Sequence, residues 1–496
     1  MQGLFEFTPP PMLYWPRISE ASFNYRNDFY HGASADAPDN GSLMPSKNRR
    51  QFIKESLEAG AAAASLTVLN PNAATAQTGQ SSHAILGAND RLRVGLIGCG
   101  GMGRNDLRQM LRNKNVDCVA LCDVDDEQAA RAQKMVETDY SQHPSLVTRD
   151  FRRLLDVQDL DAVIIGTPDH WHALPTIMAC QAGKDVYVEK PLSISIAEGR
   201  AMVNAARRHN RIVQMGTQQR SATHYKEAVD YVRSGKLGKI RLVRAWAYQN
   251  WMGNIQPVPD SEPPASVDYD MWLGPATKRP FNKNRFHFNF RWYWDYSGGL
   301  MTDWGAHMID IANWGMNVKA PLSAAAVGGK FGFPDDAEET PDTAQVIWSF
   351  ADFSLVWEHA TAIGRGPEAR DHGVAFHGNN GVLVIDRGGW EVYPESERVM
   401  GKARYKDAGL PRQNSSGEDY HFLHIKNFVD AVRSRQLPNS DVEIGHNSMI
   451  ACHLGNIAFR LGRQIRWDVD QETIIGDDEA RRYLMRNYRA PWKLPV

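Results

Sequence analysis

The chain has 496 residues, 42% of them hydrophobic, which is enough to bury cores in two domains. Lys and Arg number 56 against 58 Asp and Glu, for a net charge of −2. This balance gives no electrostatic footprint for nucleic acid, and no basic amphipathic run indicates a membrane surface. The five cysteines are scattered and lack C-x-x-C spacing, which is typical of buried thiols and not of a disulfide or zinc framework.

The N-terminal part is typical of a targeting segment. From Met44, an alternative start to Met1, the run KNRRQFIK at 47–54 resembles the twin-arginine export motif. A mild apolar stretch at 59–69 and an A-x-A cleavage site at 74–76 follow. The apolar stretch is too short to span a bilayer. We therefore expect a periplasmic or otherwise exported protein; the alternative is a basic helix in a cytoplasmic protein.

The motif around which the chain is organised follows an apolar run at 92–97. A G-x-G-x-x-G loop, Gly98–Gly103, leads into a helical pattern and then into a second apolar run at 116–122. Asp123 ends this run, 20 residues after the last glycine. Strand, glycine loop, helix, strand and acid in this order predict a dinucleotide-binding unit. A tight turn in an unrelated α/β unit and a flavin in place of NAD are the alternatives.

The residues of this motif have distinct physical roles. Gly98 permits the tight turn, Gly100 lets the backbone approach a pyrophosphate, and Gly103 lets helix and strand pack closely. Asp123 can accept hydrogen bonds from both ribose hydroxyls and would repel a 2′-phosphate, so NAD is favoured over NADP. The cofactor contacts expected in this unit are Gly98, Gly100, Gly101, Met102, Gly103 and Asp123.

Strands and helices continue to alternate up to Gln218. Buried apolar runs at 161–165, 185–188 and 211–215 are separated by helical patterns of about a dozen residues. This alternation predicts an α/β fold whose N-terminal Rossmann domain contains a doubly wound parallel sheet. Ligands of such sheets bind beyond the carboxyl ends of the strands.

The pattern changes after Gln218, where a helix at 222–233 gives way to β-rich segments. These segments predict a C-terminal α+β domain with a large, mostly antiparallel open sheet. They are residues 240–248, 322–328, 343–349, 353–358, 373–377 and 381–385.

Two late segments, 421–434 and 446–461, have apolar residues at helical spacing and are expected to pack on the C-terminal domain. Residues 257–265 and 404–417 are expected to be surface loops. The expected division is a leader with its signal and linker at 1–87, an NAD-binding Rossmann domain at 88–217, a substrate-binding domain at 218–465 and a C-terminal tail at 466–496.

Four motifs occur in order between Leu92 and Arg463. They are the Gly98–Gly103 loop, Thr167-Pro168-Asp169 with His172, Glu189-Lys190-Pro191, and Gly298-Gly299 followed by Asp303-x-x-x-His307-x-x-Asp310. Together they resemble the glucose–fructose oxidoreductase / inositol dehydrogenase (Gfo/Idh/MocA) family. The resemblance implies a Rossmann domain that binds NAD or NADP, a second domain whose sheet floors the substrate site, and a homodimer or homotetramer.

By this resemblance Lys190 stands beside the substrate oxygen. An ammonium group there lowers the pKa of the hydroxyl and stabilises developing negative charge, while Glu189 holds the lysine in place. The alternative is a lysine that ends a strand and forms a surface ion pair with its neighbour.

Asp303 and His307 are four residues apart, so on a helix they share a face and the carboxylate can orient the imidazole. Histidine suits a general base near neutral pH, and family members carry this pair in those roles; Asp310 lies on the same side. One alternative is a helix N-cap with a core histidine. The other is a metal site that adds Asp310 and His170 or His172; we expect no metal.

The remaining site residues are assigned through the same resemblance. Asp169 stands where many members have asparagine. Two aromatic runs, 286–296 and 245–251, are suited to the C–H faces of sugar rings. The further cofactor contacts are Thr167, Pro168, His172, Glu189, Lys190 and Gln218, and the substrate contacts are Lys190, Arg291, Trp294, Asp303 and His307.

The sequence therefore predicts an NAD-dependent oxidoreductase that oxidises a secondary hydroxyl of a sugar, glycoside or polyol, with Lys190, Asp303 and His307 as catalytic residues. Export implies a tightly held cofactor, because free NAD is scarce outside the inner membrane. One alternative is redox-neutral glycoside cleavage through a transient keto-sugar. The other is a non-catalytic sugar-binding protein that contains NAD.

Overall fold

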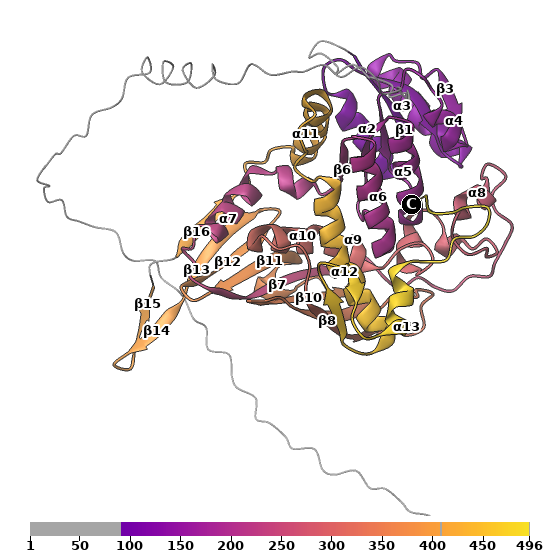
Figure 1. The fold of residues 1–496 in the computed structure, drawn as a ribbon. Coiled ribbons are helices and arrows are strands. Elements are labelled where there is room, and N and C mark those ends of the chain that lie inside the picture. Colours follow the sequence, from indigo (N-terminus) through magenta and orange to yellow (C-terminus); the bar gives the residue numbers. More distant parts are fainter. Residues whose placement is uncertain (1–90, 407–408, 496) are drawn as a thin grey trace, which may run out of the picture. The chain divides into compact units, whose positions relative to one another are not determined.

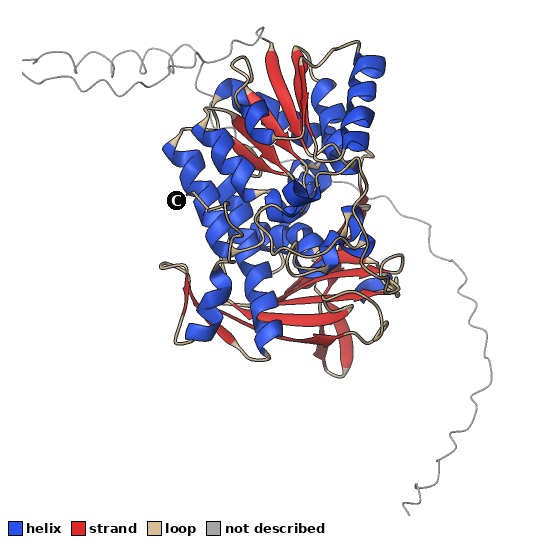
Figure 2. Cartoon of the chain, turned by 90° about the vertical axis from the view of Figure 1, so that its right-hand side faces the viewer, coloured by secondary structure: helices blue, strands red, loops and turns tan. Residues whose placement is uncertain are grey.

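The computed structural model describes residues 91–406 and 409–495. The expected leader and twin-arginine signal lie outside the described residues. The described chain contains two large β-sheets with helices around them, and a small hairpin (Figures 1 and 2). None of the helices in these residues is long and apolar enough to cross a bilayer.

The first sheet has six parallel strands in the order β3-β2-β1-β4-β5-β6, which confirms the predicted doubly wound Rossmann sheet. Its strands are almost wholly apolar because helices cover both faces. They are β1 (Leu92–Ile97), β2 (Val116–Cys122), β3 (Leu146–Thr148), β4 (Ala162–Ile165), β5 (Asp185–Val188) and β6 (Val213–Met215).

Side-chain caps fix where several helices of this sheet begin. Asp125, Asp150 and Ser195 each accept a hydrogen bond from a backbone N–H in the first turn that follows. The helices are α2 (Gly101–Leu111), α3 (Asp126–Tyr140), α4 (Phe151–Leu155), α5 (Ala173–Gln181) and α6 (Ile196–Arg208).

The second sheet has ten strands in the order β16-β13-β12-β11-β7-β10-β9-β8-β17-β18. Only β7 and β10 pair in parallel among these described strands, so the prediction of a large, mostly antiparallel sheet is confirmed. The strands are β7 (Ile240–Gln249), β8 (Ser323–Gly329), β9 (Thr343–Ser349), β10 (Ser354–Thr361), β11 (His372–Gly378), β12 (Gly381–Asp386), β13 (Gly389–Pro394), β16 (Leu410–Asn414), β17 (Ile465–Asp468) and β18 (Thr473–Ile474), and β14 (Ser396–Val399) with β15 (Lys402–Tyr405) forms the hairpin.

Helices α10 (Gly305–Met316) and α12 (Val442–Leu461) pack on this second sheet, and α12 also packs against α6 of the first domain. The buried Arg220–Asp310 ion pair fixes α10 against η2 (Gln218–Ser221), a 3₁₀ turn, at distances of 2.7 and 2.9 Å. The other helices are α7 (Thr223–Arg233), α8 (Tyr269–Leu273), α9 (Leu300–Asp303), α11 (Tyr420–Ser434) and α13 (Asp478–Arg481).

Helix α11 forms as predicted, but its expected packing is wrong. Its apolar residues Ile425, Phe428 and Val432 join the buried cluster of the parallel sheet, beside α2, and not the second sheet. Apolar periodicity shows that a helix has a buried face, and it does not show which sheet that face meets.

Two segments for which the sequence predicted no strand contain strands. Residues 404–417, expected to be a surface loop, contain β16, an edge strand that pairs with β13. Most of its side chains are exposed, so the alternation that identifies a half-buried strand is absent. The expected tail after 465 contains β18, and its Arg486 and Tyr488 both donate hydrogen bonds to buried Glu198 at 2.7 and 2.6 Å.

The glycine loop gives a test of this fold. A Cβ at Gly103 would lie 2.0 Å from the carbonyl oxygen of Gly98, whereas a Cβ at Gly101 would meet nothing within 4 Å. We expect Gly103→Ala to lower the free energy of unfolding by about 2 kcal/mol or more. Gly101→Ala should change it by less than about 1 kcal/mol. Urea unfolding without added nucleotide measures both, and equal losses would contradict this account of the turn.

Candidate active site

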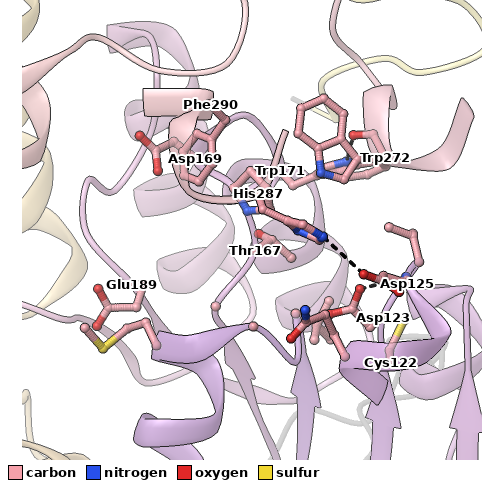
Figure 3. Close-up of a pocket in the computed structure, with 18 of the residues that line it drawn as sticks. Cys122, Asp123, Asp125, Thr167, Asp169, Trp171, Glu189, Trp272, His287 and Phe290 are labelled. Carbon is pink, nitrogen blue, oxygen red and sulfur yellow. Dashed lines mark hydrogen bonds and ion pairs between the residues drawn. The ribbon is translucent and has the colours of Figure 1, made fainter. Parts of the chain in front are cut away.

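A cavity of about 460 Å³ lies beyond the carboxyl ends of the parallel strands (Figure 3). Side chains of the C-terminal domain, among them Trp272, His287 and Phe290, cover it from the other side. Nine predicted cofactor contacts line it: Gly98, Gly100, Gly101, Met102, Asp123, Thr167, Pro168, Glu189 and Lys190.

The glycine loop fits a pyrophosphate. A Cβ at Gly100 or Gly101 would meet nothing within 4 Å, so the backbone there faces open space in the cavity. Helix α2 has no side-chain cap and no acidic residue in its first turn. Its N–H groups and its dipole are therefore available to a bound phosphate.

Asp123 stands at the edge of the same cavity. Its carboxylate accepts hydrogen bonds from the backbone N–H of Cys99 at 2.6 Å and of Asp125 at 2.9 Å, and burial raises its pKa to about 6. The cavity wall also contains Arg149, which the sequence argument did not consider, but this arginine pairs with Asp126 at 2.7 Å. Asp123 thus fits the ribose hydroxyls of NAD.

Three predicted cofactor contacts do not line this cavity. Gly103 packs against Gly98, and Gln218 lines a second cavity. His172 is buried, with its ring nitrogens 2.6 Å from the Pro191 carbonyl and 3.0 Å from the Thr167 carbonyl. The prediction of a direct His172 contact is therefore corrected: this side chain positions the two loops behind the cofactor cavity.

A second cavity of about 440 Å³ adjoins the first, and Met102, Lys190, Phe288 and Arg291 line both. It brings together Lys190, Asp303 and His307, which come from distant parts of the chain. The predicted meeting of these side chains in one pocket is therefore present in the structure. Aromatic residues of both predicted runs, Trp251 and Phe288, also contribute to its wall.

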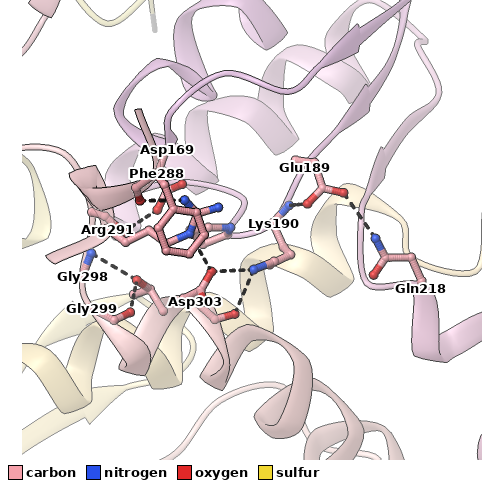
Figure 4. Close-up of polar contacts among 12 residues, drawn as sticks. Asp169, Glu189, Lys190, Gln218, Phe288, Arg291, Gly298, Gly299 and Asp303 are labelled. Atoms are coloured by element: carbon pink, nitrogen blue, oxygen red, sulfur yellow. Dashed lines mark hydrogen bonds and ion pairs between the residues drawn. The ribbon is translucent and has the colours of Figure 1, made fainter. Parts of the chain in front are cut away.

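Lys190 and Asp303 form a buried ion pair at the junction of the two cavities (Figure 4). The ammonium donates to the Asp303 carboxylate at 2.6 Å, and Arg291 donates to the same oxygen at 3.3 Å. Burial alone would raise the pKa of Asp303, but the two cations outweigh it and hold the pKa below its usual value. The carboxylate is therefore ionised.

This geometry corrects two expected contacts. Glu189 does not hold the Lys190 ammonium: its carboxylate accepts from the Lys190 backbone N–H at 3.1 Å and from Gln218 at 3.3 Å (Figure 4). Asp303 directs its carboxylate to Lys190, and the His307 Nδ1 is buried without a hydrogen-bond partner among the described residues. The motifs identified the residues, but side-chain direction decides their pairing.

His307 lies on α10, one turn after Asp303. Burial, together with the positive charges of Lys190 and Arg387, lowers its pKa well below 6.5. The imidazole is therefore neutral near pH 7 and has a lone pair with which to accept a proton.

Sequence reasoning missed part of the second cavity. Arg387, Tyr420 and His421 line it, and His421 lies 2.8 Å from the buried carboxylate of Asp106. Burial and the negative charge of Asp106 raise the pKa of Glu189 to about 8. None of the three lining residues belongs to a motif. Only the fold shows that α11 delivers Tyr420 and His421 to the site, and that Arg387 comes from the turn between β12 and β13.

Trp294 was an expected substrate contact, and that prediction is wrong. Its indole donates to the carbonyl of Glu339 at 3.0 Å, and the Arg460 guanidinium lies over its ring. It lines neither of the two cavities.

The donors of the alternative metal site are directed elsewhere. Asp310 binds Arg220 and Ser448, and His170 lies 2.9 Å from the carbonyl of Trp272. Within residues 91–406 and 409–495, no group of three or more His, Cys, Asp and Glu side chains is placed to hold a metal ion.

The parallel sheet, the open glycine loop and the Asp123 carboxylate define a domain suited to binding NAD, with a second cavity beside it. Residues 92–217 match the family model described as "Oxidoreductase family, NAD-binding Rossmann fold". Residues 225–326 and 418–494 match its "C-terminal alpha/beta domain", and residues 276–384 match the "GFO/IDH/MocA C-terminal domain". The chain belongs to the Gfo/Idh/MocA family, as its motifs indicated.

Curated relatives include oxidoreductases and glycosidases. The oxidoreductase YrbE of Bacillus subtilis, whose function is uncharacterised, is 24% identical over 75% of this chain and 92% of its own. A glycosyl hydrolase family 109 protein of Shewanella sp. is 31% identical over 209 residues, 40% of this chain. The match spans 45% of that relative's length.

Solved structures share the fold. Levoglucosan dehydrogenase in complex with NADH and levoglucosan has a TM-score of 0.56 at 20% identity, over 76% of this chain and 99% of its own. An aldose-aldose oxidoreductase from Caulobacter crescentus has a TM-score of 0.55 at 19% identity, over 76% and 99% of the two chains.

The buried Glu189 makes stability depend on pH. Its pKa is about 8 in the fold and about 4.3 in an unfolded chain. Between these two pH values the folded protein keeps a proton that the unfolded chain has released. The contribution of Glu189 to the free energy of unfolding therefore declines as pH rises to about 8. Gln at this position cannot ionise. The free energy of unfolding of Glu189→Gln, relative to that of the native protein, should therefore rise by at least about 1 kcal/mol between about pH 5.5 and about pH 8.5.

Urea unfolding at the two pH values measures this difference. The exposed Glu127→Gln is the matched control and should show no such gain. An equal pH dependence in Glu189→Gln and the native chain would contradict the assignment.

Proposed function

We propose that this protein oxidises a secondary hydroxyl of a sugar, glycoside or polyol. The observation that carries the proposal is the placement of Lys190, which lines both the cofactor cavity and the second cavity. A substrate in the second cavity would present its carbon to the cofactor and its oxygen to this ammonium. When bound, NAD supplies the hydride acceptor.

Two residues of this chain then remove the hydroxyl proton and stabilise the charge that remains. Neutral His307 accepts the hydroxyl proton, and the Lys190 ammonium stabilises the negative charge that develops on the oxygen. Asp303 keeps the ammonium in place at 2.6 Å. Arg291, with Phe288 packed against its guanidinium, supplies a polar and an apolar contact to a sugar ring.

A tightly held cofactor is part of the proposal. Side chains of the C-terminal domain cover the cofactor cavity, and His287 reaches across to Asp125 at 3.2 Å (Figure 3). Backbone bonds from Asp126 to Ser266 and from Asp268 to Val124 close the same edge. Release of NAD would require these contacts to open, which favours reoxidation of the cofactor on the enzyme.

Redox-neutral cleavage of a glycoside is the second candidate function. Relatives named as glycosyl hydrolase family 109 proteins favour it. Oxidation next to a C–H bond acidifies that bond, so a transient ketone would permit elimination of the anomeric substituent before the hydride returns. The intact Glu189-Lys190-Pro191 favours net oxidation.

The proposal also includes export of the protein and its assembly into a homo-oligomer. The twin-arginine motif at 47–54 supports transport of the folded protein to the periplasm. Exposed apolar side chains on the second sheet, Val327 and Ile347, are 67% and 54% exposed. A homodimer or homotetramer formed through this face would bury them.

Lys190→Met tests the redox mechanism. Loss of the ammonium should lower turnover at least about 100-fold, while binding of NADH, followed by nicotinamide fluorescence, is retained. Lys283→Met, an exposed lysine outside both cavities, is the control. Unchanged turnover in Lys190→Met would remove the lysine from the mechanism, and absence of turnover in the native protein across a sugar screen would favour the non-catalytic alternative.

A nitrophenyl glycoside distinguishes the two enzymatic candidates. With net oxidation, a reactive sugar should convert the bound NAD to NADH once per active site, seen as NADH absorbance, with the aglycone retained on the glycoside. Aglycone release without added NAD and without NADH accumulation would instead establish cleavage. Protein that is purified free of nucleotide and exchanges NAD rapidly would contradict the tightly held cofactor.

A further inference from the structure

A third cavity, of about 530 Å³, lies outside both cavities of the active site. Most of its lining residues come from α7, α10 and the first turns of α12, which Figure 1 labels. Four cationic side chains line it, and none of its described lining residues is acidic. The cations are Arg220, Lys226, Arg233 and Lys319.

Three of these charges lack a carboxylate partner. Arg220 pairs with Asp310 on the buried side of the cavity. Lys226 and Lys319 form no ion pair with any described residue, and Arg233 donates only to the Trp314 carbonyl. Burial and then the positive charge of Arg220 lower the pKa of Arg233, and the negative charge of Asp230 offsets this effect only in part. An anion in the cavity would relieve this repulsion.

Asn313 gives an independent indication of a ligand. It lines the cavity and is only 4% exposed, yet neither its amide nitrogen nor its amide oxygen has a hydrogen-bond partner among the described residues. A buried polar group left in this state destabilises the fold. A hydroxyl group, which both donates and accepts, would satisfy both amide atoms.

We propose that this cavity binds an anionic carbohydrate of the size of a sugar monophosphate. The phosphate would lie among Lys226, Arg233 and Lys319, and a sugar hydroxyl would bind Asn313. The site is distinct from the active site because Asn313 lies six residues beyond His307 on α10, roughly 9 Å along the helix axis. The Arg220–Asp310 ion pair lies at its floor.

Calorimetric titration of the full protein, saturated with NADH so that its pyrophosphate site is filled, tests the proposal. Glucose 6-phosphate should bind saturably and more tightly than inorganic phosphate, and any binding of glucose, which the second cavity could accept, should not change when Lys226 and Lys319 are replaced. Lys226→Gln/Lys319→Gln should weaken binding at least about tenfold. The control, Lys134→Gln/Lys402→Gln, makes the same change in charge at exposed positions outside the cavity and should bind as the native protein does.

Asn313→Leu provides a second variant. It should weaken glucose 6-phosphate binding and at the same time raise the unfolding temperature, because the unsatisfied amide is removed. Absence of saturable binding to the native protein, or equal affinity in the Lys226→Gln/Lys319→Gln variant, would overturn the proposal. So would a change in sedimentation of that variant without any phosphate binding, which would make the cluster a contact between subunits.

Discussion

The Lys190–Asp303 ion pair is the interaction on which the arrangement of the site depends. Its side chains are only 12% and 8% exposed, and they join the end of β5 in the parallel sheet to α9 in the C-terminal domain. A buried charge without its partner is strongly destabilising. The pair therefore requires the two domains to pack in one relative position. That position places the second cavity beside the first.

Two further contacts support this constraint, one within the C-terminal domain and one across the boundary. The Arg220–Asp310 pair holds α10 against η2, and the ring of His424 on α11 lies 2.9 Å from the carbonyl of Met215 at the end of β6. The late helices thus return to the parallel sheet before the chain adds β17 and β18, the last two strands of the second sheet. This return explains why α11 supplies residues to the second cavity although it is far from the glycine loop in sequence.

The sequence predicted most of the fold because its signals are local. An apolar run such as 92–97 has few ways to be buried, and the Gly98–Gly103 spacing requires one turn geometry. Pairings between side chains that are distant in sequence could not be predicted in the same way. The Glu189-Lys190 sequence does not indicate which carboxylate the ammonium contacts. The residues around Trp294 do not indicate that the Glu339 carbonyl accepts its indole N–H. Tertiary packing decides such pairings. Periodicity shows that an element has a buried face, but it does not show which element that face contacts.

The division of protonation states in the site follows from the same packing. Lys190 lowers the pKa of both neighbours, and the effect on each is different: Asp303 stays an anion that anchors the ammonium, while His307 stays a neutral base. Had Asp303 bonded His307, as the helical spacing suggested, its negative charge would have acted on the imidazole at closer range and raised its pKa further, toward the protonated form. The pairing that sequence spacing did not predict is therefore the one that leaves a neutral base and a fixed cation together beside the cofactor cavity.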